Sequence, residues 1–95
     1  MLVLSLKAEK QLENLFEYLI SKWSVRIQKK VAEKIYKNFK LIEVNCELFP
    51  KSNYNIDLHK CVVSKQTTIF YQVRKNEIVV ISVFDTRQNP FKINK

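Results

Sequence analysis

The 95-residue sequence contains no glycine, two prolines, two cysteines and a single histidine. Loops that cradle phosphate groups need glycine where the backbone approaches the ligand, so this absence excludes the P-loop and the dinucleotide-binding fingerprint. One histidine and two cysteines, with no C-x-x-C pair, are too few ligands for a zinc site. The sequence therefore predicts a protein with no metal site and no cofactor.

Acidic residues are also scarce, because 17 Lys and Arg residues stand against 9 Asp and Glu residues and give a net charge of +8. A charge of this sign favours a polyanionic or acidic partner. The 46% of hydrophobic residues is typical of a folded rather than a disordered chain. We expect residues 1–95 to form a single domain with a thin core. A bound partner can add to the stability of such a domain.

Long hydrophobic runs are absent as well. The initial MLVLSLK has no basic segment, and its apolar run of about five residues is too short for a signal peptide or a membrane span. Two cysteines without a secretory signal, Cys46 and Cys61, are better interpreted as reduced thiols than as a disulfide. We therefore expect a cytoplasmic protein without membrane contact.

The first half of the chain has helical periodicity after a short predicted strand over 2–6. Ser5 is the expected N-cap of a helix over 7–23, and Ser24 that of a second helix ending near Asn45. The expected core side chains of the first helix include Leu12, Leu15, Phe16, Leu19 and Trp23, and those of the second are Ile27, Val31, Ile35, Phe39 and Ile42. Helices joined by so short a connection predict an antiparallel hairpin.

The second half changes to strand patterns over 56–63, 67–74 and 77–84. The last of these is almost continuously apolar, which predicts a central strand covered on both faces. A tight turn at Lys75-Asn76 is expected to place Asn76 at positive φ. The order β-α-α-β-β-β predicts an α+β fold in which the helix hairpin covers one face of a small, mostly antiparallel sheet.

This order of elements accompanies a set of specific segments: AEKQLENLFEYLISKW, LIEVNCELFP and KCVVSKQTTIFYQVRKNEIVVISVFDTRQNP. Together they resemble the RelE/ParE superfamily of bacterial toxins from type II toxin–antitoxin modules over nearly the whole chain. The resemblance implies a growth-arresting toxin that a co-expressed antitoxin neutralises in a hetero-oligomer. It also implies one of two targets: RelE-like members cut messenger RNA on the ribosome without a metal, whereas ParE-like members bind DNA gyrase without chemistry.

The residues at the nuclease positions of the superfamily favour the ParE-like alternative. Thr68 stands where the nuclease carries an arginine, and His59 and Cys61 stand where it carries lysines. Lys60 alternates with these two and should lie on the opposite face of its strand. The length of the helix hairpin is also more ParE-like. The resemblance therefore implies gyrase binding more than ribosome-dependent cleavage of mRNA.

If the protein is nevertheless a metal-independent endoribonuclease, its chemistry must come from a few cations and one base. Arg87, Lys65 and Lys60 are the candidates to stabilise charge on the cleaved phosphate. His59 is the candidate proton acceptor. The alternative for Arg87 is a salt bridge with Asp85 or a helix carboxylate, and we expect Arg87, as a tail residue, to bury little surface.

Two further surfaces are candidate binding sites. One face of the second helix is basic and is the candidate surface for the target, or else a solvated face; its residues are Arg26, Lys29, Lys30, Lys34, Lys37 and Lys40. Phe70, Thr68 and Phe84 are the candidate antitoxin contacts. A competing hypothesis is a non-toxic basic binding module that has kept the fold.

Overall fold

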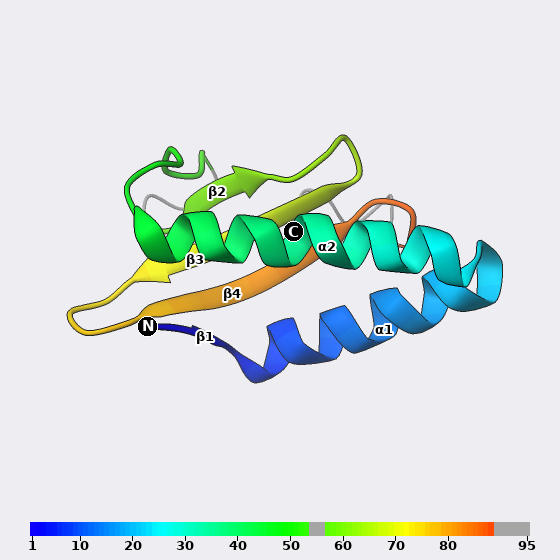
Figure 1. Cartoon of the computed structure of the whole chain (residues 1–95). Helices are drawn as coiled ribbons and strands as arrows, with labels where there is room; N and C mark the ends of the chain where they lie inside the picture. Colours follow the sequence, from blue (N-terminus) through cyan, green and yellow to red (C-terminus); the bar gives the residue numbers. More distant parts are fainter. Residues whose placement is uncertain (54–56, 89–95) are drawn as a thin grey trace.

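The computed structural model describes residues 1–53 and 57–88, and its elements follow the predicted order. They are β1 (Leu2–Leu4), α1 (Leu6–Lys22), α2 (Val25–Val44), β2 (His59–Val62), β3 (Thr67–Val73) and β4 (Ile78–Asp85). The antiparallel hairpin of α1 and α2 lies on one face of the sheet, and the other face points away from both helices (Figure 1). The predicted α+β architecture is therefore confirmed.

Both predicted serine caps are present at the starts of the two helices. The Ser5 hydroxyl accepts a hydrogen bond from the Ala8 backbone N–H at 3.0 Å. The Ser24 hydroxyl likewise accepts one from the Ile27 N–H at 3.1 Å. Each bond satisfies one of the free N–H groups that a helix leaves at its N-terminus. The two serine caps therefore fix where α1 and α2 begin, and Ser24 lies in the connection between them.

The four strands form one sheet in the order β1-β4-β3-β2, with β1 parallel to β4 and the other pairs antiparallel. The predicted central position of β4 is confirmed, and its adjacent Val79 and Val80, which point to opposite faces, are both buried. The prediction for Asn76 is wrong, since no described non-glycine residue has a positive φ. Four residues separate the paired Val73 and Ile78, and a connection of this length can turn with negative φ throughout.

The first turns of α1 protect the edge of β4 beyond the end of β1. The Ser5 N–H donates to the Val80 carbonyl at 2.9 Å, and the Ser5 hydroxyl donates to the Ile81 carbonyl at 2.9 Å. Further along, the Val83 N–H donates to the Gln11 Oε1 at 2.8 Å. Beyond the end of β1 no strand of the described residues pairs with this edge of β4, and these bonds satisfy backbone N–H and carbonyl groups that would otherwise have no partner there. They also fix the path of β4 toward Asp85.

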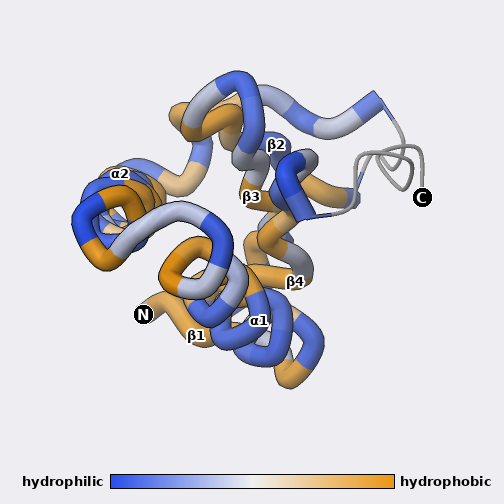
Figure 2. Tube along the Cα trace, turned by 90° about the vertical axis from the view of Figure 1, so that its right-hand side faces the viewer, coloured by the Kyte–Doolittle hydropathy of each residue, from blue (hydrophilic) through white to orange (hydrophobic). Residues whose placement is uncertain are grey.

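The core lies between the hairpin and the sheet, where the hydrophobic stripes of the helices meet β3 and β4 (Figure 2). The main contributors are Leu12, Leu15, Leu19, Ile35, Phe39, Ile42, Ile69, Tyr71, Val80 and Val83. The prediction that Trp23 belongs to this core is wrong, because its side chain is 56% exposed. Trp23 is the C-cap of α1 at the tip of the hairpin, so its position on the helical stripe does not bring it over the sheet.

Candidate functional site

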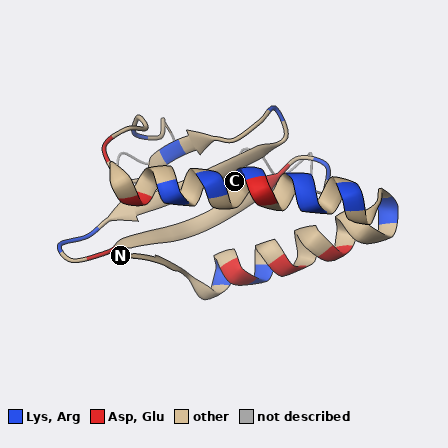
Figure 3. Ribbon diagram, viewed as in Figure 1, with Lys and Arg blue, Asp and Glu red and all other residues tan. Residues whose placement is uncertain are grey.

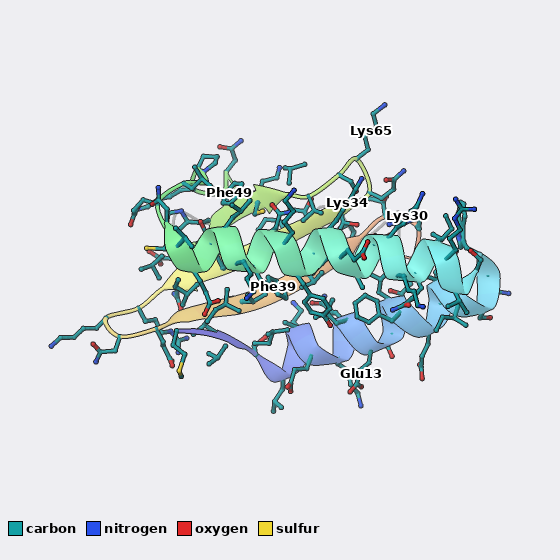
Figure 4. The ribbon with its side chains drawn as sticks, in the orientation of Figure 1. Glu13, Lys30, Lys34, Phe39, Phe49 and Lys65 are labelled. Carbon is teal, nitrogen blue, oxygen red and sulfur yellow. The ribbon has the colours of Figure 1, made fainter. Side chains whose placement is uncertain are left out.

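The outer face of α2 is strongly basic. The helix carries six basic residues against two acidic ones, whereas α1 carries three of each. All six predicted residues are exposed: Arg26, Lys29, Lys30, Lys34, Lys37 and Lys40. Figure 3 shows the excess of basic residues on α2 and the mixed charges of α1. In Figure 4, Lys30 and Lys34 project on the same side as Lys65, which lies in the connection between β2 and β3.

A buried ion pair follows the end of β4. The Asp85 carboxylate accepts hydrogen bonds from Arg87 Nη2 at 2.8 Å, from Arg87 Nε at 3.0 Å and from the Arg87 backbone N–H at 2.9 Å. It also accepts one from the Thr67 hydroxyl at 2.6 Å. The side chain of Arg87 is only 16% exposed, so the expectation that this residue buries little surface is wrong. The predicted alternative, a salt bridge with Asp85, is confirmed.

A pocket of about 80 Å³ opens beside this ion pair. Its wall on the helix side consists of Val31 and Lys34, and Arg87 closes it from the end of β4. The connection between β2 and β3 supplies the opposite wall with Val63, Ser64 and Gln66. The pocket therefore brings one lysine of the basic helix face together with the arginine that sequence reasoning had assigned to a separate site.

His59 lies at the other end of the sheet, among buried groups. It is 5% exposed, and its ring stacks on Tyr71 with centroids 4.9 Å apart and an interplanar angle of 12°. Its Nδ1 donates to the Phe49 carbonyl at 2.8 Å, and the Tyr71 hydroxyl donates to the Cys46 carbonyl at 2.8 Å. Burial raises the pKa of Tyr71 to about 12. Both rings thus attach the segment after α2 to the sheet.

The two cysteines are free thiols, as predicted. Cys61 is fully buried, and its Sγ donates to the Asn38 Oδ1 at 3.4 Å. Burial raises the pKa of Cys61 to about 11, so the group is a protonated thiol at neutral pH. Cys61 is therefore a poor nucleophile where it stands.

The predicted antitoxin contacts lie together on the sheet face that points away from the helices. Thr68 pairs with Phe84 across β3 and β4, and Phe70 pairs with Lys60 across β3 and β2. Directly paired residues share a face, and these four are partly exposed. Val62, 58% exposed and paired with Thr68, extends this face and was missed by sequence reasoning.

The structure therefore does not bring the four nuclease candidates together at one site. Lys60 and His59 are on opposite faces of β2. Lys65 is exposed on the connection whose Ser64 and Gln66 line the pocket with Arg87, and the Arg87 guanidinium is bound to Asp85. Sequence reasoning missed the pocket formed by Lys34, Arg87 and their neighbours. Only the close spacing of Asp85 and Arg87 signalled the ion pair, and no sequence pattern linked either residue to α2.

The described residues include neither a helix with the length and apolar character of a membrane span nor a group of three potential metal ligands. The family model described as "ParE toxin of type II toxin-antitoxin system, parDE" matches residues 2–90. A search of curated proteins finds no match.

Among solved structures, the chain is similar to a chain of the chromosomal ParDE toxin–antitoxin system from P. aeruginosa. The TM-score is 0.75 at 13% sequence identity, and the match covers 88% of this chain and 92% of that chain. At this identity the likeness shows the fold alone. It agrees with the α+β arrangement expected from the sequence.

Proposed function

The chain belongs to the family of ParE toxins of type II toxin–antitoxin systems, and on that premise we propose that it arrests growth by binding DNA gyrase in the cytoplasm. In this proposal the toxin performs no chemistry, and a cognate antitoxin neutralises it by forming a hetero-oligomer with it. The basic face of α2 engages the target. Phe70, Thr68 and Phe84 on the open sheet face engage the antitoxin.

One observation carries the proposal: the largest group of charges is presented outward on one helix. Among the described residues, none of the six basic residues of α2 forms a salt bridge. Charges that are not used within the fold remain available to a partner and accelerate its association. A helix whose charges are mostly positive suits binding of a large acidic surface.

The arrangement of the nuclease candidates supports binding rather than cleavage. Metal-free RNA cleavage requires a base and cations that converge on one phosphate. His59 is buried beneath the segment that follows α2, and the guanidinium of Arg87 is engaged by Asp85. Lys60 faces the other side of the sheet from His59. These groups do not converge.

The experiment that tests the target surface replaces Lys30, Lys34 and Lys37 together by Gln. Glutamine keeps the helix propensity and removes three charges, so the thermal midpoint should stay nearly constant. Growth arrest should weaken strongly, since the change removes half of the basic face. The matched control replaces Lys7, Lys10 and Lys22 by Gln: these residues are exposed on α1 and carry the same total charge. The control should remain toxic, and equal effects of the two triple variants would contradict the proposed surface.

The target itself is tested with purified gyrase and with RNA from the same induced cells. The wild-type protein should inhibit supercoiling, and addition of the antitoxin should restore it. Primer extension should show no codon-positioned cuts in transcripts. Such cuts, without inhibition of supercoiling, would establish the RelE-like alternative. Soluble expression without any growth arrest would instead support the non-toxic binding module.

A further inference from the structure

The pocket beside the Asp85–Arg87 ion pair has a composition that none of the functions above explains. Its walls combine apolar side chains, Val31 and Val63, with the cationic groups of Lys34 and Arg87. The hydroxyl of Ser64 and the amide of Gln66 add neutral polar groups. A lining that combines apolar side chains with two cations is complementary to a short aliphatic chain that ends in an anion.

The ion pair holds Arg87 in one orientation and leaves part of its guanidinium available. The Asp85 carboxylate accepts hydrogen bonds from Nε and Nη2 of Arg87, and Nη2 also lies 3.4 Å from the Thr67 hydroxyl. Within residues 1–53 and 57–88, the Nη1 group of Arg87 donates no hydrogen bond. An arginine has five N–H donors in a planar fork, so a second acceptor can bind at the remaining edge. The side chain is thereby preorganised for an anion.

Charge and size both limit what the pocket accepts. Asp85 balances Arg87, so Lys34 leaves a single net positive charge, which suits one carboxylate better than a phosphate dianion. A volume of about 80 Å³ is well below the roughly 300–1,000 Å³ of a small-molecule pocket. It admits the end of a side chain and not a nucleotide.

We propose that this pocket receives the carboxylate of a glutamate from an acidic protein segment, with Lys34 and the free edge of Arg87 as its partners. The two methylene groups of the glutamate lie against Val31 and Val63. Lys30 and Lys37, the neighbours of Lys34 on the outer face of α2, attract further carboxylates of the same segment. The inference goes beyond the proposed function, because it concerns a peptide side-chain pocket and requires no gyrase.

The test uses the full chain and a short acetylated peptide of alternating Glu and Ala residues with a fluorescent label. Its affinity is measured by fluorescence anisotropy, and the Arg87 Nε–H and the Ser64 and Gln66 amides are followed by NMR. Lys34→Gln, within the pocket, should weaken binding about tenfold or more, because a charge-assisted hydrogen bond to a partly enclosed group is lost. Lys37→Gln is the matched control: it removes the same charge from the same helix face outside the pocket, and should weaken binding by about twofold.

A second comparison separates the pocket from diffuse attraction and from nucleic acid. The same peptide with Gln in place of Glu should not bind, and one with Asp should bind more weakly because its shorter side chain does not reach Arg87. Equal losses in the Lys34→Gln and Lys37→Gln variants, or no shift of the Arg87 Nε–H on binding, would overturn the pocket.

A single-stranded oligonucleotide whose binding depends on Lys34 more than on Lys37 would reassign the pocket to phosphate, and absence of peptide binding to the folded protein would also overturn the proposal. None of these results alters the supercoiling measurement, so failure of the pocket and failure of the gyrase proposal are distinguishable.

Discussion

Two polar clusters at opposite ends of β3 use buried side chains in different ways. The first, the histidine–tyrosine cluster, consists of His59, whose Nδ1 donates to the Phe49 carbonyl, and Tyr71, whose hydroxyl donates to the Cys46 carbonyl. The second, the aspartate–arginine cluster, consists of Thr67, Asp85 and Arg87. The first is enclosed beneath the segment that follows α2, whereas the second contains an ion pair and borders a pocket.

The difference shows which buried polar groups remain able to bind a partner. Where a ring donor bonds to a backbone carbonyl and burial separates the ring from solvent, that donor is not open to a partner. An arginine has more donors than one carboxylate can accept, so the same bonds that fix Arg87 leave an edge available. The first cluster therefore stabilises the fold, and the second can serve both stability and binding.

The largest effect is expected from Arg87→Ala. This change leaves the Asp85 carboxylate buried without its cation, and breaking a buried ion pair costs about 3 kcal/mol or more. The free energy of unfolding, measured by urea denaturation, should fall by that amount at neutral pH. Arg87→Lys should lose less, since it keeps the charge while losing the bidentate geometry. A loss below about 0.5 kcal/mol for the alanine variant would show that the cluster does not stabilise the fold.

The protein should lose stability at alkaline pH because of Cys61, which lies on β2 between the two clusters. Its pKa rises from the ordinary 9.0 to about 11 in the folded state, so the unfolded chain loses this proton first. The free energy of unfolding should therefore decrease between about pH 9 and pH 11, by on the order of 2 kcal/mol. Cys61→Ala should show a shallower decrease over the same range in denaturation at each pH. An unchanged slope would mean that the thiol is not shielded from water.

A smaller effect is expected for His59→Phe. The ring can keep its stacking on Tyr71, but the Phe49 carbonyl loses its hydrogen bond, which costs about 1 kcal/mol. Growth arrest should persist at temperatures at which the variant is folded, because the proposed role of the histidine–tyrosine cluster is structural. A folded variant that no longer arrests growth would restore a chemical role for His59.

The smallest effect on stability is expected for Lys34→Gln. Lys34 is exposed and forms no ion pair within the described residues, so the free energy of unfolding should change by less than about 0.5 kcal/mol. If the Lys34→Gln variant keeps its stability and loses peptide binding, then the groups that bind the peptide differ from the bonds of the aspartate–arginine cluster that stabilise the fold. A thermal midpoint lowered as much as in Arg87→Ala would instead make Lys34 part of the stabilising network.

Local sequence determined the helices, their serine caps and the alternation of the strands. Ser5 and Ser24 act on N–H groups three residues away, and periodicity reflects which side of an element meets the core. These features depend on neighbours in the chain, so the order of elements and the basic face of α2 could be predicted. The family resemblance also came from segments that the sequence displays directly.

Only the tertiary structure decided which polar residues meet and which remain accessible. The burial of His59 depends on the segment after α2 folding over it, and the exposure of Trp23 depends on where the hairpin extends past the sheet. Lys34 and Arg87 are far apart in sequence and line one pocket because the connection between β2 and β3 packs beside α2. Such contacts arise from the relative position of whole elements, which no local pattern of residue types encodes.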